Sequence, residues 1–224
     1  MATKTRLELR ERTLFLGTYE NSAKFTPTYV NVELQAGLNE LYSLMADANE
    51  GYFDTETTTP TVAAQAYVDL PATFWRLRGV DILIGGRYSE LRQIGVTDRN
   101  KFQANTGRPE AYRTITGGAR GRLQLYPTPS GIETIRIVYT PTCPVWTADA
   151  DSFEFYSGNE DYVVTATLLR LDQREERPLG ERQQELERLR QRIIKDVSQR
   201  RAAEPELLPL GRDFDLTDDA WWWL

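Results

Sequence analysis

The sequence contains no histidine and a single cysteine, Cys143. Zinc sites built from cysteine and histidine are therefore excluded, as are nucleophiles that depend on a histidine base. No disulfide can form within the chain, which fits a reducing compartment or an assembly that needs no covalent cross-links. Carboxylate chemistry, a hard cation bound by oxygen ligands, or no chemistry at all remain as possibilities.

Long apolar runs are also missing, because none approaches the roughly 18 residues that a membrane span requires. Residues 1–12 are polar and charged, so we expect no signal peptide. A length of 224 residues and a mass of 25.7 kDa suggest one to two domains with enough chain to bury a core. A net charge of −6 argues against a protein that grips nucleic acid with its whole surface.

The charge is unevenly distributed towards the C-terminus. Residues 170–201 contain ten basic and seven acidic side chains, whereas residues 203–224 contain six acidic side chains and one basic side chain, Arg212. One interpretation is contact between segments or subunits, and the other is a solvated surface.

Two helices are predicted before residue 50. The first covers residues 5–15, with Gly17 as its stop signal. The second begins with Thr26 as N-cap and Pro27 at the first helical position. It continues to about Asn49 because apolar residues recur at helical spacing, at Val30, Leu34, Leu38, Leu41, Met45 and Ala48.

Residues 51–146 have β character, with glycine and proline between short β-prone runs. Strands are expected at residues 52–59, 66–70, 74–84, 111–116, 122–126 and 134–139, and a turn at Gly85 and Gly86. Residues 88–102 mix a strand or turn with a possible short helix that Ser89 or Thr97 could cap. The regular spacing favours an antiparallel sandwich or small barrel.

Helical periodicity returns near Gly158. The first stripe comprises Tyr162, Ala166 and Leu169, with Leu168 and Leu171 beside them. After a break at Pro178 and Gly180 a second stripe follows, formed by Leu186, Leu189, Ile193 and Val197. The pattern predicts an αα-hairpin, with surface pairs between Glu185 and Arg188 and between Glu187 and Arg190.

The expected fold class is α+β. Residues 1–50 and 150–202 should form a helical bundle, into which an antiparallel β-sandwich or barrel module of residues 51–149 is inserted. Residues 203–224 should form an extended tail, because Pro205, Pro209 and Gly211 break any helix there.

The tail ends in an acidic and aromatic segment. Each indole can bury roughly 200 Å², and three exposed tryptophans would invite aggregation. The tail could fold back on its own domain, insert into a partner subunit or add a strand to a partner's sheet. Membrane anchoring is disfavoured because the adjacent acids repel anionic lipid. The candidate partner-binding residues are Phe214, Leu216, Asp218, Asp219, Trp221, Trp222, Trp223 and Leu224.

Four other features could carry chemistry, and each has a simpler structural interpretation. The glycine-rich residues 117–121 lack the ending of a phosphate-binding loop and suit a hairpin turn or a mobile loop. Cys143 has no histidine or second thiol to activate it. Arg188, Arg190, Arg192, Arg200 and Arg201 could touch phosphate, or form a solvated or inter-subunit helix face. Paired carboxylates could act as acid and base or bind calcium, at Asp149, Asp151, Glu154, Glu160 and Asp161.

A series of short motifs follows in a fixed order along residues 1–200. They are LELRER at 7–12, FTPTYVN at 25–31, LNELY at 38–42, YVDLPATFWRLRGV at 67–80, GRPEAY at 107–112 and LQLYPTP at 123–129, followed by Tyr139 and the C-terminal helical hairpin. This ordered set resembles the head-to-tail adaptor (connector) proteins of tailed bacteriophages, a family related to tail-tubular-type proteins.

The resemblance implies a non-enzymatic virion protein without cofactor, metal or catalytic residues. Such adaptors typically form a ring of twelve subunits in the neck of the virion, assembled in the host cytoplasm. The ring docks on the portal protein, extends the DNA channel and carries tail or nozzle proteins. Double-stranded DNA would be met only in passage, and no membrane is involved. Another neck or tail-completion protein, and a carboxylate-based hydrolase, stay open as alternatives.

Overall fold

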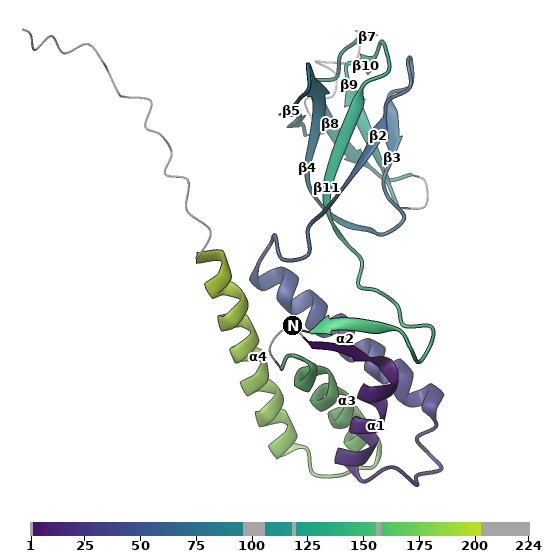
Figure 1. Cartoon of the computed structure of the whole chain (residues 1–224), viewed down its shortest axis with the longest axis vertical. Helices are drawn as coiled ribbons and strands as arrows, with labels where there is room; N and C mark the ends of the chain where they lie inside the picture. Colours follow the sequence, from purple (N-terminus) through teal and green to yellow (C-terminus); the bar gives the residue numbers. More distant parts are fainter. Residues whose placement is uncertain (1, 96–105, 118–119, 156–157, 203–224) are drawn as a thin grey trace, which may run out of the picture.

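The computed structural model describes residues 2–95, 106–117, 120–155 and 158–202. Within these ranges the helices gather at one end of the long axis, and most of the strands gather at the other (Figure 1). We call α1–α4 with β1 and β12 the helical region, and β2–β11 the β region. The mixed α+β class predicted from the sequence is confirmed.

The first two helices begin at the N-caps that the sequence indicates. Helix α1 (Arg6–Gly17) starts with a capping box, in which the Glu8 backbone N–H donates to Thr5 Oγ1 and the Thr5 N–H donates to a Glu8 carboxylate oxygen. Helix α2 (Pro27–Ala48) starts after Thr26, whose hydroxyl accepts from the Tyr29 N–H at 3.3 Å. The predicted α2 stripe is buried, apart from Ala48 at its end.

The C-terminal hairpin forms as predicted, from α3 (Glu160–Arg174) and α4 (Gly180–Ala202). Leu189, Ile193 and Val197 of α4 are buried, and Leu186 is partly buried. The single α3 stripe is wrong in one respect, because Leu169 is only half-buried while Val163 and Thr167 are inaccessible. Helix α3 lies centrally and contacts α1, α2 and α4, so it buries most of its circumference.

Two short strands that the sequence does not predict complete the helical region. β1 (Ala2–Thr5) pairs antiparallel with β12 (Ser152–Phe155), in the register Ala2 to Phe155. The ladder continues into α1, where the Arg6 N–H donates to the Asp151 carbonyl at 2.9 Å. This pairing binds the N-terminal segment to the chain that leads into α3.

The β region contains two four-stranded sheets. One has the order β2 (Thr55–Pro60), β11 (Thr134–Pro141), β4 (Phe74–Ile84) and β5 (Arg87–Glu90). The other has the order β3 (Tyr67–Asp69), β9 (Arg122–Tyr126), β8 (Ala111–Ile115) and β6 (Arg92–Gln93). All six predicted strands are present, and the β4–β5 turn is made by two glycines with φ of 54° and 81°.

Three expectations for the β region need correction. No closed barrel forms among the described strands, because both sheets end in unpaired edges. The pairing is not wholly antiparallel, since β6 pairs in parallel with β8, and β7 (Thr106–Gly107) with β10 (Thr128–Pro129). Ser89 lies within β5 and therefore caps no helix, while Thr97 lies outside the described residues.

Each region has its own apolar core. The large core of the helical region takes side chains from all four helices, together with Trp146 and Phe155. The core of the β region takes buried side chains from both four-stranded sheets, including Val80, Leu123 and Ile137. None of the helices in the described ranges is long and apolar enough to cross a membrane.

Candidate functional site

The residues predicted to bind a partner lie in residues 203–224, outside the part of the chain that the structure describes. The structure does show where that segment begins. Helix α4 ends at Ala202, at the end of the helical region that faces the β region, as does the C-terminus of α2 (Figure 1). The direction of α4 therefore determines where the chain leaves the described fold.

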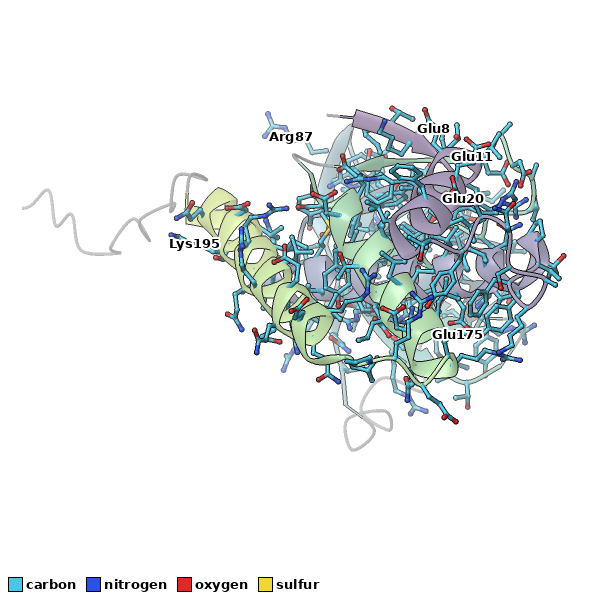
Figure 2. The ribbon with its side chains drawn as sticks, turned by 90° about the horizontal axis from the view of Figure 1, so that it is seen from below. Glu8, Glu11, Glu20, Arg87, Glu175 and Lys195 are labelled. Atoms are coloured by element: carbon cyan, nitrogen blue, oxygen red, sulfur yellow. The ribbon has the colours of Figure 1, made fainter. Side chains whose placement is uncertain are left out.

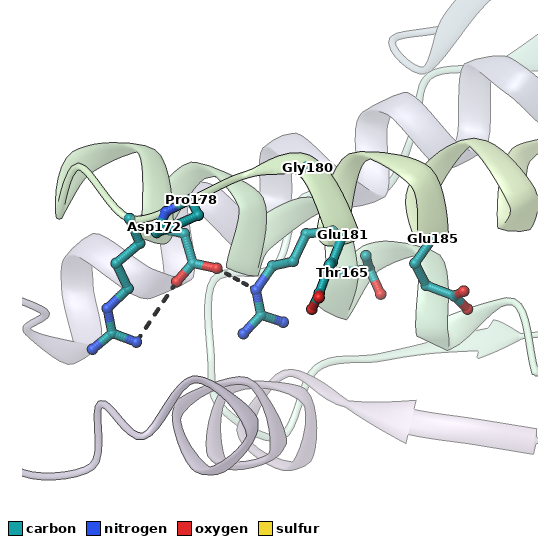
Figure 3. A pocket seen from close by; sticks show the side chains of 8 residues that line it. Thr165, Asp172, Pro178, Gly180, Glu181 and Glu185 are labelled. Atoms are coloured by element: carbon teal, nitrogen blue, oxygen red, sulfur yellow. Dashed lines mark hydrogen bonds and ion pairs between the residues drawn. The ribbon is translucent and has the colours of Figure 1, made fainter.

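A buried carboxylate fixes the start of α4. Asp172 of α3 is 2% exposed, and its Oδ1 accepts a hydrogen bond from the Tyr19 hydroxyl at 2.5 Å. Its Oδ2 accepts from Nε of Arg182 on α4, and the Arg177 guanidinium lies 4.0 Å from Oδ1 (Figure 3). Two guanidinium groups thus face one buried negative charge, which suits a site that holds three helices together. We call these four residues the Asp172 cluster.

The Asp172 cluster borders an open cavity of about 740 Å³ between α3 and the first turns of α4. Thr165, Pro178, Glu181 and Glu185 also line it (Figure 3). Both oxygens of Asp172 are already engaged, and burial together with the Asp172 hydrogen bond raises the pKa of Tyr19 to about 12. The Tyr19 hydroxyl therefore keeps its proton at neutral pH and donates it to Asp172, a contact that joins the segment after α1 to α3.

Asp149, a member of the predicted carboxylate cluster, is held by two arginine side chains. Asp149 accepts hydrogen bonds from Arg10 to both oxygens at 2.8 Å, and from Arg6 at 2.8 Å. These bonds, first from Arg10 and then from Arg6, lower the pKa of Asp149 to about 2. The Arg6 side chain also donates to the carbonyls of Trp146 and Thr147, so it anchors the segment that returns from the β region.

The other four carboxylates of that cluster do not converge on one site. Asp151 accepts the backbone N–H groups of Ala148 and Thr147, which lower its pKa. Asp161 pairs with Arg12 at 2.5 Å. Glu154 lies exposed on β12, and Glu160 opens α3. Among the described residues, no group of three or more potential ligands could hold a metal ion.

The remaining candidates also have structural roles in the described ranges. Gly117 and Gly121 flank the β8–β9 connection, with φ of 155° and 96°, as the predicted hairpin turn requires. Burial raises the pKa of the Cys143 thiol to about 12, so the thiol remains protonated. Arg188 and Arg190 pair with Glu185 and Glu187 at 3.5 and 3.8 Å, as the sequence predicts.

A second hollow of the helical region is a groove along α2 that the sequence did not reveal. It measures about 680 Å³, and its most exposed apolar side chains are Val32 and Val145, at 62% and 70%. One wall of the groove is α2, and the other is the segment of residues 145–147. Gln35 of α2 holds the two walls together, because its side-chain amide donates to the Pro144 carbonyl and accepts from the Trp146 N–H. The i, i+4, i+7 spacing of Thr28, Val32 and Gln35 was the available signal, but the other wall of the groove lies more than 100 residues away in the chain.

The described surface therefore offers contact faces and no convergence of reactive groups. Exposed apolar side chains and grooves of this kind are typical of surfaces that contact other proteins. A family model described as SU10 adaptor protein matches residues 5–209, and the chain belongs to this family. Membership confirms the resemblance to phage adaptor proteins that the ordered motifs suggested. No curated protein matches the chain.

Proposed function

We propose that the chain is the head-to-tail adaptor in the neck of a tailed bacteriophage, a non-enzymatic subunit of a ring of twelve copies. The observation that carries this proposal is the family match over residues 5–209, which includes the described elements from Thr5 to the end of α4. The structural use of the candidate carboxylates, above all Asp149, supports the absence of catalysis. The ring would dock on the portal protein and carry tail or nozzle proteins below it.

In our proposal, three parts of the chain share the adaptor function. Residues 1–50 and 150–202 act as a helical bundle domain, residues 51–149 as a β-sandwich domain, and residues 203–224 as a docking tail. The separate apolar cores of the two regions support the first two parts. The third rests on residue chemistry, because the acidic and tryptophan-rich segment lies beyond the matched residues.

The tail would anchor the ring on the portal. Its aromatic and apolar residues would fill grooves between portal subunits, and its acids would set the orientation. The residues assigned to this contact are Phe214, Leu216, Asp218, Asp219, Trp221, Trp222, Trp223 and Leu224.

The charge of the chain suits a DNA conduit. Twelve copies of a subunit with net charge −6 would make a strongly acidic ring. Such a ring repels the phosphate backbone, so double-stranded DNA can pass through without being held.

The direct test is co-purification with the portal protein of the same phage, with the complexes imaged by electron microscopy. The full-length chain should form rings on the portal, and a chain truncated after Ala202 should not. Replacing Trp221, Trp222 and Trp223 with alanine should weaken capture, while alanine at Leu207, Leu208 and Leu210 serves as the matched control. Equal capture of the truncated chain would refute the tail assignment, and no capture of the full-length chain would refute the adaptor function.

A further inference from the structure

The outward face of α1 carries exposed apolar and acidic side chains together. Leu7, Glu11 and Phe15 follow one another at four-residue spacing, with Glu8 beside them, and all four are exposed. Phe15 is 65% exposed, although large apolar side chains are usually buried. Glu11 forms no ion pair within the described residues. We call these four residues the α1 face.

The outward face of α4 has the opposite charge. Arg188, Arg192 and Lys195 are exposed and lie on one stripe of the helix, away from the buried Leu189 and Ile193. Between residues 188 and 199 the helix has four basic side chains and one acidic side chain. Lys195 forms no ion pair within the described ranges, and Arg192 donates only to the Gly158 carbonyl at 3.0 Å. We call Arg188, Arg192 and Lys195 the α4 face.

The two faces lie on different sides of the helical region. Seen along the long axis, Lys195 points outward on the side of α4, whereas Glu8 and Glu11 project on the side of α1 (Figure 2). A contact between two copies that joins different patches is heterologous, and repetition of such a contact closes a ring when the rotation allows it. A contact between two identical faces would instead oppose like charges.

We propose that the α4 face of one copy packs on the α1 face of the next copy in the ring. Lys195 and Arg192 would pair with Glu11 and Glu8, and their long aliphatic stems would cover Phe15. The partner that covers the α1 face is a second copy of this chain, because the positive charges of the α4 face complement the negative charges of the α1 face. This inference rests on the proposed ring, and it names the surfaces by which the ring closes.

The composition of the chain allows a site-specific test of this contact. The chain has four lysines, at Lys4, Lys24, Lys101 and Lys195. A carbodiimide joins an amine to a carboxylate only when the two groups touch, so it reports direct ion pairs. In rings assembled on the portal from a mixture of isotope-labelled and unlabelled chains, mass spectrometry should find Lys195 joined to Glu11 or Glu8 of a different chain. Lys195→Arg is the matched control, because it keeps the charge and assembly but should lose the cross-link.

Charge reversal tests the same contact through assembly. Glu11→Lys and Lys195→Glu should each reduce ring formation about tenfold, and the double variant should restore most of it. Phe15→Ser should also weaken assembly while leaving the melting temperature of the free subunit unchanged. Glu110→Lys and Arg87→Glu in the β region are the matched controls, since both positions are exposed there.

The outcomes separate this inference from the proposed function. The α1–α4 contact would be overturned, and the adaptor function left intact, by two results together. Wild-type rings would lack the cross-link, and each charge-reversal variant would still form rings. Failure of the wild-type chain to form rings with the portal would overturn the adaptor function and this contact together. Loss of assembly in each single variant, with recovery in the double variant, would support the contact.

Discussion

The helical region and the β region bury polar groups to different extents. In the helical region the buried residues include Arg6, Asn159 and Asp172, of which two are charged. In the described β region the buried polar side chains are neutral, at Thr61 and Thr140. Its ion pairs range from the rim, as between Arg122 and Asp69, where the aspartate is 72% exposed, to the partly covered pair of Arg136 with Asp81.

The difference follows from how each region sets its register. Strands align through ladders of backbone hydrogen bonds, so the β region needs no buried charge to fix the pairing of β4 with β11. Helices satisfy their backbone internally and can slide or rotate on an apolar surface. The helical region joins segments far apart in the chain, and polar contacts such as Tyr19 to Asp172, 153 residues apart, hold one arrangement. We infer that these contacts supply specificity more than stability.

Both regions should respond alike to the loss of apolar core volume, and this is the largest expected effect. Leu41 in the helical core and Ile137 in the β core are both fully buried. Leu41→Ala and Ile137→Ala should each lower the free energy of unfolding by about 2–5 kcal/mol, measured by urea denaturation. Leu16→Ala, at a position 48% exposed, should change it by less than about 0.5 kcal/mol. If Leu41→Ala were as stable as Leu16→Ala, the assignment of the α2 stripe to the core would be wrong.

Removal of one carboxylate charge should cost more stability in the helical region, at the buried Asp172, than at the rim of the β region. Asp172→Asn keeps the shape of the side chain but removes the charge that two guanidinium groups face. We expect a loss of roughly 2 kcal/mol, because the arginines are partly exposed and can recover water. The same change at Asp69 in the β region should cost less than about 0.5 kcal/mol. Equal losses in thermal unfolding would remove the contrast between the regions.

The sequence predicted the elements whose signals are local. Helix α2 was found because its cap, its proline and its stripe lie within one window, and β4 and β9 end at the predicted residues because turn residues bound them. The β1–β12 pair was missed, because a four-residue polar strand is recognised only with its partner some 150 residues away. The Asp172 cluster and the α2 groove were missed for the same reason.

The contacts of Arg78 with the connection between the two regions should matter less for stability than for the order of that connection. Arg78 of β4 contacts Asp54 Oδ1 at 3.3 Å and Thr140 Oγ1 at 3.2 Å, and it also donates to the Glu50 carbonyl. Arg78→Ala should cost about 1 kcal/mol and make the 49–54 connection more sensitive to protease. Arg122→Ala, which removes a rim pair within one sheet, is the matched control. Unchanged cleavage at 49–54 would show that the contacts of Arg78 do not order this connection.

The smallest expected effect is a loss of stability at low pH, and it depends on the contacts of Asp149 in the helical region. Because the pKa of Asp149 is lowered to about 2 in the folded chain, against about 3.9 in an unfolded chain, its contribution to stability is complete above about pH 4. That contribution is lost as the pH falls through 2. Urea denaturation from pH 5 to 2.5 should therefore show the difference between wild type and Asp149→Asn shrinking as the pH falls. Arg10→Gln, which removes the main cause of the lowered pKa, should move this loss to higher pH. A stability difference that is constant across the range would mean that Arg6 and Arg10 do not hold the charged form of Asp149.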